Sequence, residues 1–126
     1  REAIVQSRVG QGKFREDLIR YWEKCAVTGC ELFKILKASH IKPWRYSSNI
    51  ERLDKFNGLL LIPNLDSTFD NGLISFDNEG KIIISNLLSE DDKNKLGINV
   101  EMKMRRIEVD HNKYLHYHRQ NVFRWD

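Results

Sequence analysis

Hydrophobic residues near the N-terminus recur with the period of a helix. In K-F-R-E-D-L-I-R-Y-W-E-K, residues 13–24, the apolar side chains fall at positions i, i+4, i+7 and i+8. These side chains are Phe14, Leu18, Tyr21 and Trp22. Residues at this spacing share one side of a helix. The pattern predicts an amphipathic helix whose apolar face packs on the core.

Two short apolar runs in the middle of the chain are each stopped by a proline. The first run, residues 35–41, ends shortly before Pro43, and the second, G-L-L-L-I-P at residues 58–63, ends at Pro63. Proline restricts the residue before it and has no N–H to donate to a sheet. We therefore predict two short strands, joined by a polar loop at residues 46–56.

Turn and capping residues mark the remaining elements. C-A-V-T-G-C, residues 25–30, is predicted to form a short strand and a turn, because Thr28-Gly29 punctuates it. L-I-S-F and K-I-I-I-S flank the turn D-N-E-G as the strands of a hairpin. Helices are predicted at residues 64–72 between Asn64 as N-cap and Gly72 as C-cap, at 89–96 after Ser89, and at 112–123. Together these elements predict an α+β fold in a single domain spanning residues 1–126.

Composition and cysteine content narrow the class of protein. The chain is 40% hydrophobic and 31% charged, as an ordinary globular domain is. No apolar run approaches the roughly 20 residues of a membrane-spanning helix, so we expect no membrane partner. Cys25 and Cys30 are too few for a disulfide framework or a closed structural zinc site, which fits a reducing, cytoplasmic location. The chain begins with arginine rather than methionine, so we expect it to be the C-terminal part of a longer chain.

Charge is unevenly distributed along the chain, whose net charge is +3. Residues 1–46 contain ten Lys or Arg against five Asp or Glu, whereas residues 47–100 contain five against nine. A basic segment is a hint of a nucleic-acid partner, although a solvated helix face has the same composition.

Candidate chemistry is concentrated between residues 40 and 70. His40 lies near the end of one predicted strand and Asn57 at the start of the next. Asp66 and Asp70 are four residues apart, so both carboxylates project from one face of the predicted helix. Two like charges at this spacing repel each other, and a cation between them reverses the effect. The pattern therefore predicts a metal ion or a basic partner at this helix.

Each of these residues also has a structural explanation. Asp66 lies in a first helical turn, where a negative charge interacts favourably with the helix dipole. Asp70 precedes Asn71-Gly72 and is explained equally well as a solvated turn residue. A single histidine beside Ile41 is more often a packed side chain than a catalytic one.

The order of the motifs is typical of one nuclease family. C-A-V-T-G-C, A-S-H-I-K-P-W-R, N-G-L-L-L and L-D-S-T-F-D-N-G-L-I-S-F resemble the HNH endonucleases, in particular the branch with C-x-V-T-G, A-x-H-I-x-P and N-G-L-L-L motifs. The flanks R-V-G-Q-G-K-F-R and Y-L-H-Y-H-R-Q-N-V-F resemble this family too. The resemblance implies a ββα-metal core that hydrolyses phosphodiester bonds, usually in DNA. The N-terminal helix, the extra hairpin and the C-terminal helix are expected around that core.

The resemblance also implies roles for individual residues. His40 matches the general base, and Asn57 matches the asparagine that fixes the loop and hence the orientation of the histidine. The metal-binding histidine of the family falls on Asp66, and the ligand one turn later falls on Asp70. Because carboxylates are hard oxygen ligands, the expected ion is Mg²⁺ or Mn²⁺ rather than zinc or nickel. Ser39 occupies a position where many family members have a further metal ligand, so the site is expected to be poor in ligands.

The hypothesis also includes residues that contact DNA and an alternative function without catalysis. The candidates for contacting DNA phosphates are Lys42, Arg45 and, less directly placed, Lys37. His111, His116 and His118 are interpreted as core and surface residues. The family resemblance makes restriction or phage defence a plausible setting, with sequence specificity in an upstream domain or a partner. The alternative is a nucleic-acid-binding module that kept the HNH fold and lost the chemistry.

Overall fold

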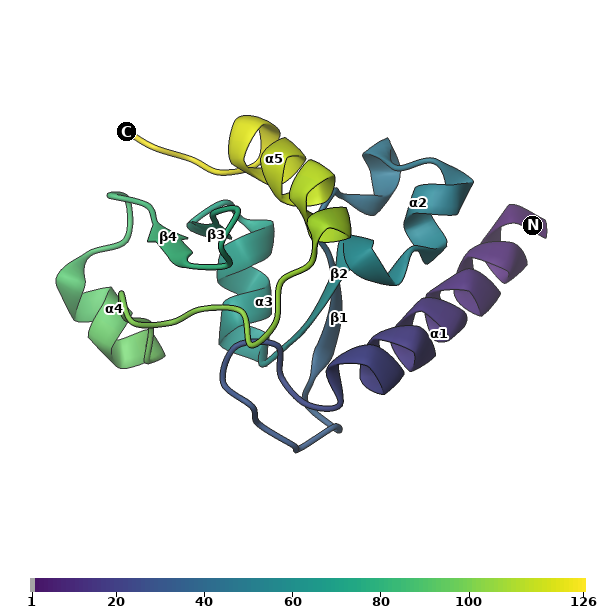
Figure 1. Ribbon diagram of the computed structural model, residues 1–126, viewed down its shortest axis with the longest axis horizontal. Helices are drawn as coiled ribbons and strands as arrows, with labels where there is room; N and C mark the ends of the chain where they lie inside the picture. Colours follow the sequence, from purple (N-terminus) through teal and green to yellow (C-terminus); the bar gives the residue numbers. More distant parts are fainter. Residues whose placement is uncertain (1) are drawn as a thin grey trace.

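The described part of the chain folds into two small antiparallel sheets surrounded by α-helices (Figure 1). The structure is a computed structural model, which describes the backbone of residues 2–126 and the side chains of residues 10–126. The elements are α1 (Glu2–Trp22), β1 (Lys37–His40), α2 (Asn49–Leu53), β2 (Gly58–Leu61), α3 (Pro63–Asp70), β3 (Ile74–Phe76), β4 (Ile82–Ile84), α4 (Glu90–Leu96) and α5 (Asn112–Asn121). This mixture of helices and short strands confirms the predicted α+β class.

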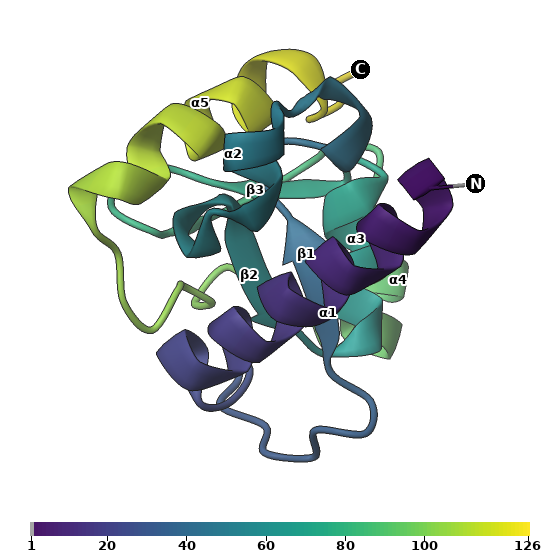
Figure 2. The same cartoon turned by 90° about the vertical axis from the view of Figure 1, so that its right-hand side faces the viewer.

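The first sheet and α3 form a ββα unit, and α1 packs against the sheet from the other side (Figures 1 and 2). β1 pairs antiparallel with β2, with His40 opposite Gly58. Every residue of β2 is buried, as are Phe14 and Leu18 of α1. A Cβ atom on Gly58 would lie 2.5 Å from the Phe14 ring, so only glycine permits this close approach of α1. The amphipathic helix therefore buries its apolar face on β2, as its periodicity predicted.

The second sheet is the predicted hairpin. β3 pairs antiparallel with β4, and Ile74 lies opposite Ile84. α5 packs against β3 and carries the fully buried His118, while the 3-10 turn before α5 contributes the fully buried His111. His116 is exposed. The three histidines thus have the core and surface positions that were expected of them.

Several predicted boundaries are wrong in an instructive way. Residues 25–30 form a turn without a strand, closed by the Cys25 N–H, which donates to the Cys30 carbonyl at 2.9 Å. The predicted loop 46–56 contains α2, which is too short for a periodic pattern. Ser48 caps this helix by a reciprocal capping box with Glu51.

α3 also begins earlier than predicted. Its N-cap is Ile62, and Pro63 occupies the first turn, where the missing N–H costs nothing. Asn64 is therefore inside the helix rather than its cap, and its side-chain amide donates to the Leu96 carbonyl. At the other end, the C-cap is Asn71, and Gly72 follows it with φ of 73°. Pro63 thus ends β2 and starts α3 at the same point.

Among the described residues, no helix is both long enough and apolar enough to cross a lipid bilayer.

Candidate active site

A pocket of about 480 Å³ lies beside β1, on the side facing α3. Five of the eight predicted site residues line it, namely Lys37, Ser39, His40, Asp66 and Asp70. Asn57, Lys42 and Arg45 lie outside this lining. The ββα unit thus brings the candidate base and the paired carboxylates to one pocket, although they are 26 or more residues apart in the sequence.

His40 is held by two contacts at the end of β1. Its ring stacks on Phe14, with the ring centroids 3.8 Å apart and the planes 5° from parallel. Its Nε2 lies 2.9 Å from the backbone carbonyl oxygen of Arg52. A carbonyl only accepts hydrogen bonds, so Nε2 carries the proton and Nδ1 of the neutral ring keeps its lone pair. Within the described residues, Nδ1 has no hydrogen-bond partner.

The surroundings of His40 favour its neutral form. Burial lowers the pKa of the imidazole, and the Arg52 guanidinium acts in the same direction, while the hydrogen bond to the Arg52 carbonyl opposes them. A histidine with a lowered pKa is neutral near pH 7. The ring is thus in the protonation state of a general base. The hydrogen bond from Nε2 to the Arg52 carbonyl makes Nδ1 the basic nitrogen.

Asn57 is fully buried and fastens the loop that follows His40. Its Oδ1 accepts the Lys42 N–H at 2.8 Å, and its Nδ2 donates to the Glu51 carbonyl at 3.0 Å. Its own backbone carbonyl accepts the Ile41 N–H at 3.0 Å. Glu51 precedes the residue whose carbonyl holds the His40 ring. One side chain therefore ties both ends of the loop to β2 and so supports the orientation of the imidazole.

Asp66 and Asp70 lie one turn apart on α3. Burial raises the pKa of Asp66, although Ser39 and the charge of Lys37 lower it. Asp70 is exposed as a residue, but partial burial of its carboxyl group and the neighbouring charge of Asp66 raise its pKa to about 6. The Ser39 hydroxyl donates to Asp70 Oδ1 at 3.3 Å. Two carboxylates that disfavour each other's ionisation form a site that a cation stabilises.

The oxygen donors at this position fit a hard divalent ion. Across the part of the chain that the structure describes, no three His, Cys, Asp or Glu side chains group together as metal ligands. The pocket offers two carboxylates and the Ser39 hydroxyl. Mg²⁺ commonly binds through one or two carboxylates and keeps several waters, whereas a closed zinc site needs four protein ligands. The donor set therefore fits Mg²⁺ or Mn²⁺ and does not fit structural zinc.

His118 also lines the pocket but has no free nitrogen. Its Nε2 lies 2.9 Å from the Phe69 carbonyl, and its Nδ1 lies 2.7 Å from the Ser75 hydroxyl. Burial lowers its pKa to about 4. Both ring nitrogens are satisfied inside the protein, so His118 is a packed side chain rather than a ligand or a base.

The three cations expected to contact DNA differ in their surroundings. Lys42 forms an ion pair with Glu51 at 3.1 Å, so its charge is already partnered inside the protein. Arg45 is exposed, with its guanidinium 5.2 Å from the Tyr46 ring centroid. Lys37 is exposed and lines the pocket. Of the three, Lys37 is the one that lines the pocket together with the candidate base and carboxylates.

Two contributors to the site carried no recognisable signal in the sequence. Phe14 reads as part of the apolar face of α1, and its contact with His40 depends on how α1 packs. Arg52 acts through its backbone carbonyl, which every residue possesses. Only the tertiary structure identifies either of them.

Comparison with known proteins agrees with the arrangement of these elements. The family model described as HNH endonuclease matches residues 25–77. That segment contains β1, β2, α3 and β3, while the resembling flanks lie outside it. No curated protein matches the chain. The segment that carries His40, Asn57, Asp66 and Asp70 is therefore the one that matches the HNH endonuclease family model.

Proposed function

We propose that the protein is a divalent-metal-dependent endonuclease that hydrolyses phosphodiester bonds in DNA, with His40 as the general base. The observation that carries this proposal is the environment of His40. One ring nitrogen donates to a fixed carbonyl, while the other is unpartnered within the described residues and the ring lines the pocket that contains Asp66 and Asp70. The family match supports nuclease chemistry in general.

The roles of the residues follow from these surroundings. His40 takes a proton at Nδ1 from the attacking water, and its Nε2–H bond to the Arg52 carbonyl keeps the ring in the required tautomer. Asn57 is a positioning residue that acts through the loop. Asp66 and Asp70 would hold Mg²⁺ or Mn²⁺, with Ser39 orienting Asp70. When bound, the divalent ion supplies positive charge that stabilises the charge developing on the phosphate and the leaving oxygen.

A nucleic-acid-binding module without catalysis is the second candidate. The observation that favours it is the small donor set, in which a hydroxyl and two carboxylates replace a larger cluster of ligands. Both candidates bind nucleic acid, and we assign contacts with its phosphates to Lys37 and Arg45. Restriction or phage defence is the biological setting that the family resemblance indicates for the active enzyme.

A cleavage assay on supercoiled plasmid DNA separates the two candidates. We expect nicking or cutting with Mg²⁺ or Mn²⁺, no reaction with EDTA, and loss of the reaction in His40→Ala. His116→Ala is the matched control, because it removes an exposed imidazole from α5 and should cut at the rate of the unmodified protein. Cutting in EDTA, or full activity of His40→Ala, would contradict the mechanism. DNA binding without cutting under any divalent ion would favour the binding module.

A further inference from the structure

A second groove, of about 420 Å³, lies on the other side of β1 from the pocket that contains the aspartates. α1 forms one of its walls, and the segment leading into β1 forms the other (Figure 2). Lys37, Ala38 and His40 line both the groove and the pocket. β1 is thus a shared wall, and His40 is reached from both sides.

The two cavities have opposite charge. Among the described side chains, the groove lining includes Arg15, Lys34 and Lys37 and no acidic residue. The pocket lining contains both aspartates and only one of these cations, Lys37. A polyanion is therefore attracted to the groove and repelled by the pocket, unless the pocket is neutralised by a cation.

The cations of the groove differ in what they contact. Arg15 donates to the Leu36 carbonyl at 2.7 Å and to the Phe33 carbonyl at 2.9 Å, so it fixes the segment that lies between α1 and β1. Lys34 and Lys37 are exposed on that segment, and no ion pair among the described side chains includes them. Two ammonium groups are thus presented by a backbone that Arg15 holds in place.

We propose that this groove binds the nucleic-acid backbone next to the bond that is cut, with Lys34 and Lys37 contacting its phosphates and Arg15 positioning them. The inference rests on the proposed function for the identity of its substrate. A strand that lies in the groove passes His40 as it reaches the carboxylates, so the groove sets which phosphate meets the base. Lys34 and Arg15 thereby join the site, although both lie outside the central motifs that carry His40, Asn57, Asp66 and Asp70.

Salt-dependent DNA binding tests this assignment without requiring cleavage. Binding of a fluorescent 20-base-pair duplex is measured by anisotropy in EDTA, in a His40→Ala background, between roughly 50 and 200 mM salt. Each phosphate contact that is lost lowers the slope of log K against log salt by about 0.9. We expect Lys34→Gln and Lys37→Gln each to lower the slope by about that amount, and to weaken binding about five- to tenfold near 0.1 M salt. The double variant should lose about twice as much slope.

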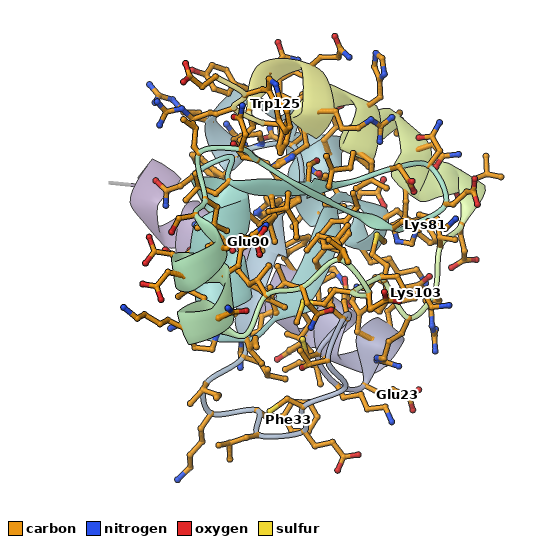
Figure 3. The ribbon with its side chains drawn as sticks, turned by 90° about the vertical axis from the view of Figure 1, so that its left-hand side faces the viewer. Glu23, Phe33, Lys81, Glu90, Lys103 and Trp125 are labelled. Atoms are coloured by element: carbon orange, nitrogen blue, oxygen red, sulfur yellow. The ribbon has the colours of Figure 1, made fainter. Side chains whose placement is uncertain are left out.

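Lys103→Gln is the matched control, because it removes the same charge from another face. Lys103 is exposed, and its backbone forms an isolated antiparallel β-bridge with Lys81, next to the hairpin of β3 and β4 (Figure 3). Phe33 marks the segment that carries Lys34 in the same view, at the lower edge of the molecule and below Lys81 and Lys103. The control should reduce binding much less than either groove variant. Thermal unfolding of each variant confirms that these surface changes leave the fold intact.

The outcomes for the groove and for the proposed nuclease are distinguishable. If the double variant keeps the slope and affinity of Lys103→Gln, or if the protein does not bind DNA, the groove assignment is overturned. If the lysines control binding but the unmodified protein never cuts DNA with Mg²⁺ or Mn²⁺, the groove stands and the nuclease proposal falls. If the protein cuts DNA and the double variant cuts with unchanged KM, the nuclease proposal stands and the groove falls.

Discussion

His40, at the end of β1, and His118, on α5, line the same pocket from different elements and share three features. Each ring stacks on a phenylalanine at 3.8 Å between centroids, His40 on Phe14 and His118 on Phe69. Each places Nε2 2.9 Å from a backbone carbonyl oxygen, that of Arg52 or that of Phe69. Burial lowers the pKa of both. Neither stacking, nor the tautomer, nor a lowered pKa therefore distinguishes them.

The difference lies in the second nitrogen. Nδ1 of His118 is 2.7 Å from the Ser75 hydroxyl, in a fully buried position between α5 and β3. Nδ1 of His40 has no hydrogen-bond partner among the described residues, and the residue lines two cavities. A buried histidine becomes a candidate base when one nitrogen is fixed and the other is left for a reactant. The same residue stabilises the fold when both nitrogens are satisfied inside it.

Replacing His40 by glutamine should have the largest effect. The glutamine amide can still donate to the Arg52 carbonyl, but it has no basic nitrogen. We expect kcat for DNA cleavage to fall by about 10²- to 10⁴-fold, as for the loss of a general base. The free energy of unfolding should change by less than about 1 kcal/mol. Cleavage rates and urea unfolding of the same preparation measure both, and a variant that keeps its rate would remove the distinction between the two histidines.

Acid should destabilise the fold mainly through His118. Its folded pKa of about 4 lies below the ordinary value of about 6.5 in the unfolded chain. Between these values the unfolded chain binds more protons, so stability is lost as the pH falls from about 6.5 toward about 4. We expect the free energy of unfolding to drop by about 3 kcal/mol over this range, measured by urea unfolding at several pH values. An unchanged midpoint between pH 7 and pH 4.5 would contradict the burial of a neutral His118.

The same glutamine substitution at His118 should reverse the pattern seen at His40. The variant keeps a donor for the Phe69 carbonyl but loses the stacked ring and the partner of the Ser75 hydroxyl. We expect the free energy of unfolding to fall by about 2 kcal/mol and kcat of the folded protein to stay the same. The acid dependence described above should be weaker in this variant. A selective loss of kcat, without a loss of stability, would show that His118 takes part in the reaction.

Replacing Asp70 by asparagine should have a smaller effect of opposite sign. The raised pKa of Asp70 means that stability is lost as the pH rises through about 6 and the carboxyl group ionises beside Asp66. Without divalent ions, we expect Asp70→Asn to raise the free energy of unfolding at pH 8 by less than about 1 kcal/mol. The stabilisation that Mn²⁺ gives the unmodified protein should be reduced. Thermal unfolding with and without Mn²⁺ tests both, and an undiminished response to Mn²⁺ would argue against Asp70 as a ligand.

Replacing Phe14 by leucine should have the smallest effect, a modest rise in the pKa of His40. The smaller side chain uncovers one face of the imidazole, so less burial remains to lower its pKa. We expect the acid limb of the pH profile of kcat/KM to move upward by about half a pH unit. Leu18→Ala is the control, because it also weakens the packing of α1 on β2 but keeps the Phe14 ring that stacks on His40. A limb that stays in place would show that Phe14 supports the fold and not the base.

Much of the fold was accessible from local patterns. The helical period around Phe14 and Leu18 predicted the C-terminal half of α1, which begins at Glu2 rather than near residue 13. The prolines after two apolar runs predicted β1 and β2. The hairpin of β3 and β4 followed from its turn. The errors fell where local signals are short, as in the five residues of α2, or where one residue serves two elements, as Pro63 does.

The sequence by itself determined the resemblance to HNH endonucleases, the α+β class and the order of the ββα elements, because these depend on periodicity, prolines and motifs that are close together along the chain. It also placed two carboxylates on one helical face, since a separation of four residues decides that. Only the tertiary structure separated His40 from His118, because the partner of each nitrogen comes from a distant segment. The groove between α1 and β1 likewise exists only after packing, since Arg15 of α1 reaches the Phe33 and Leu36 carbonyls through contacts that no local pattern encodes.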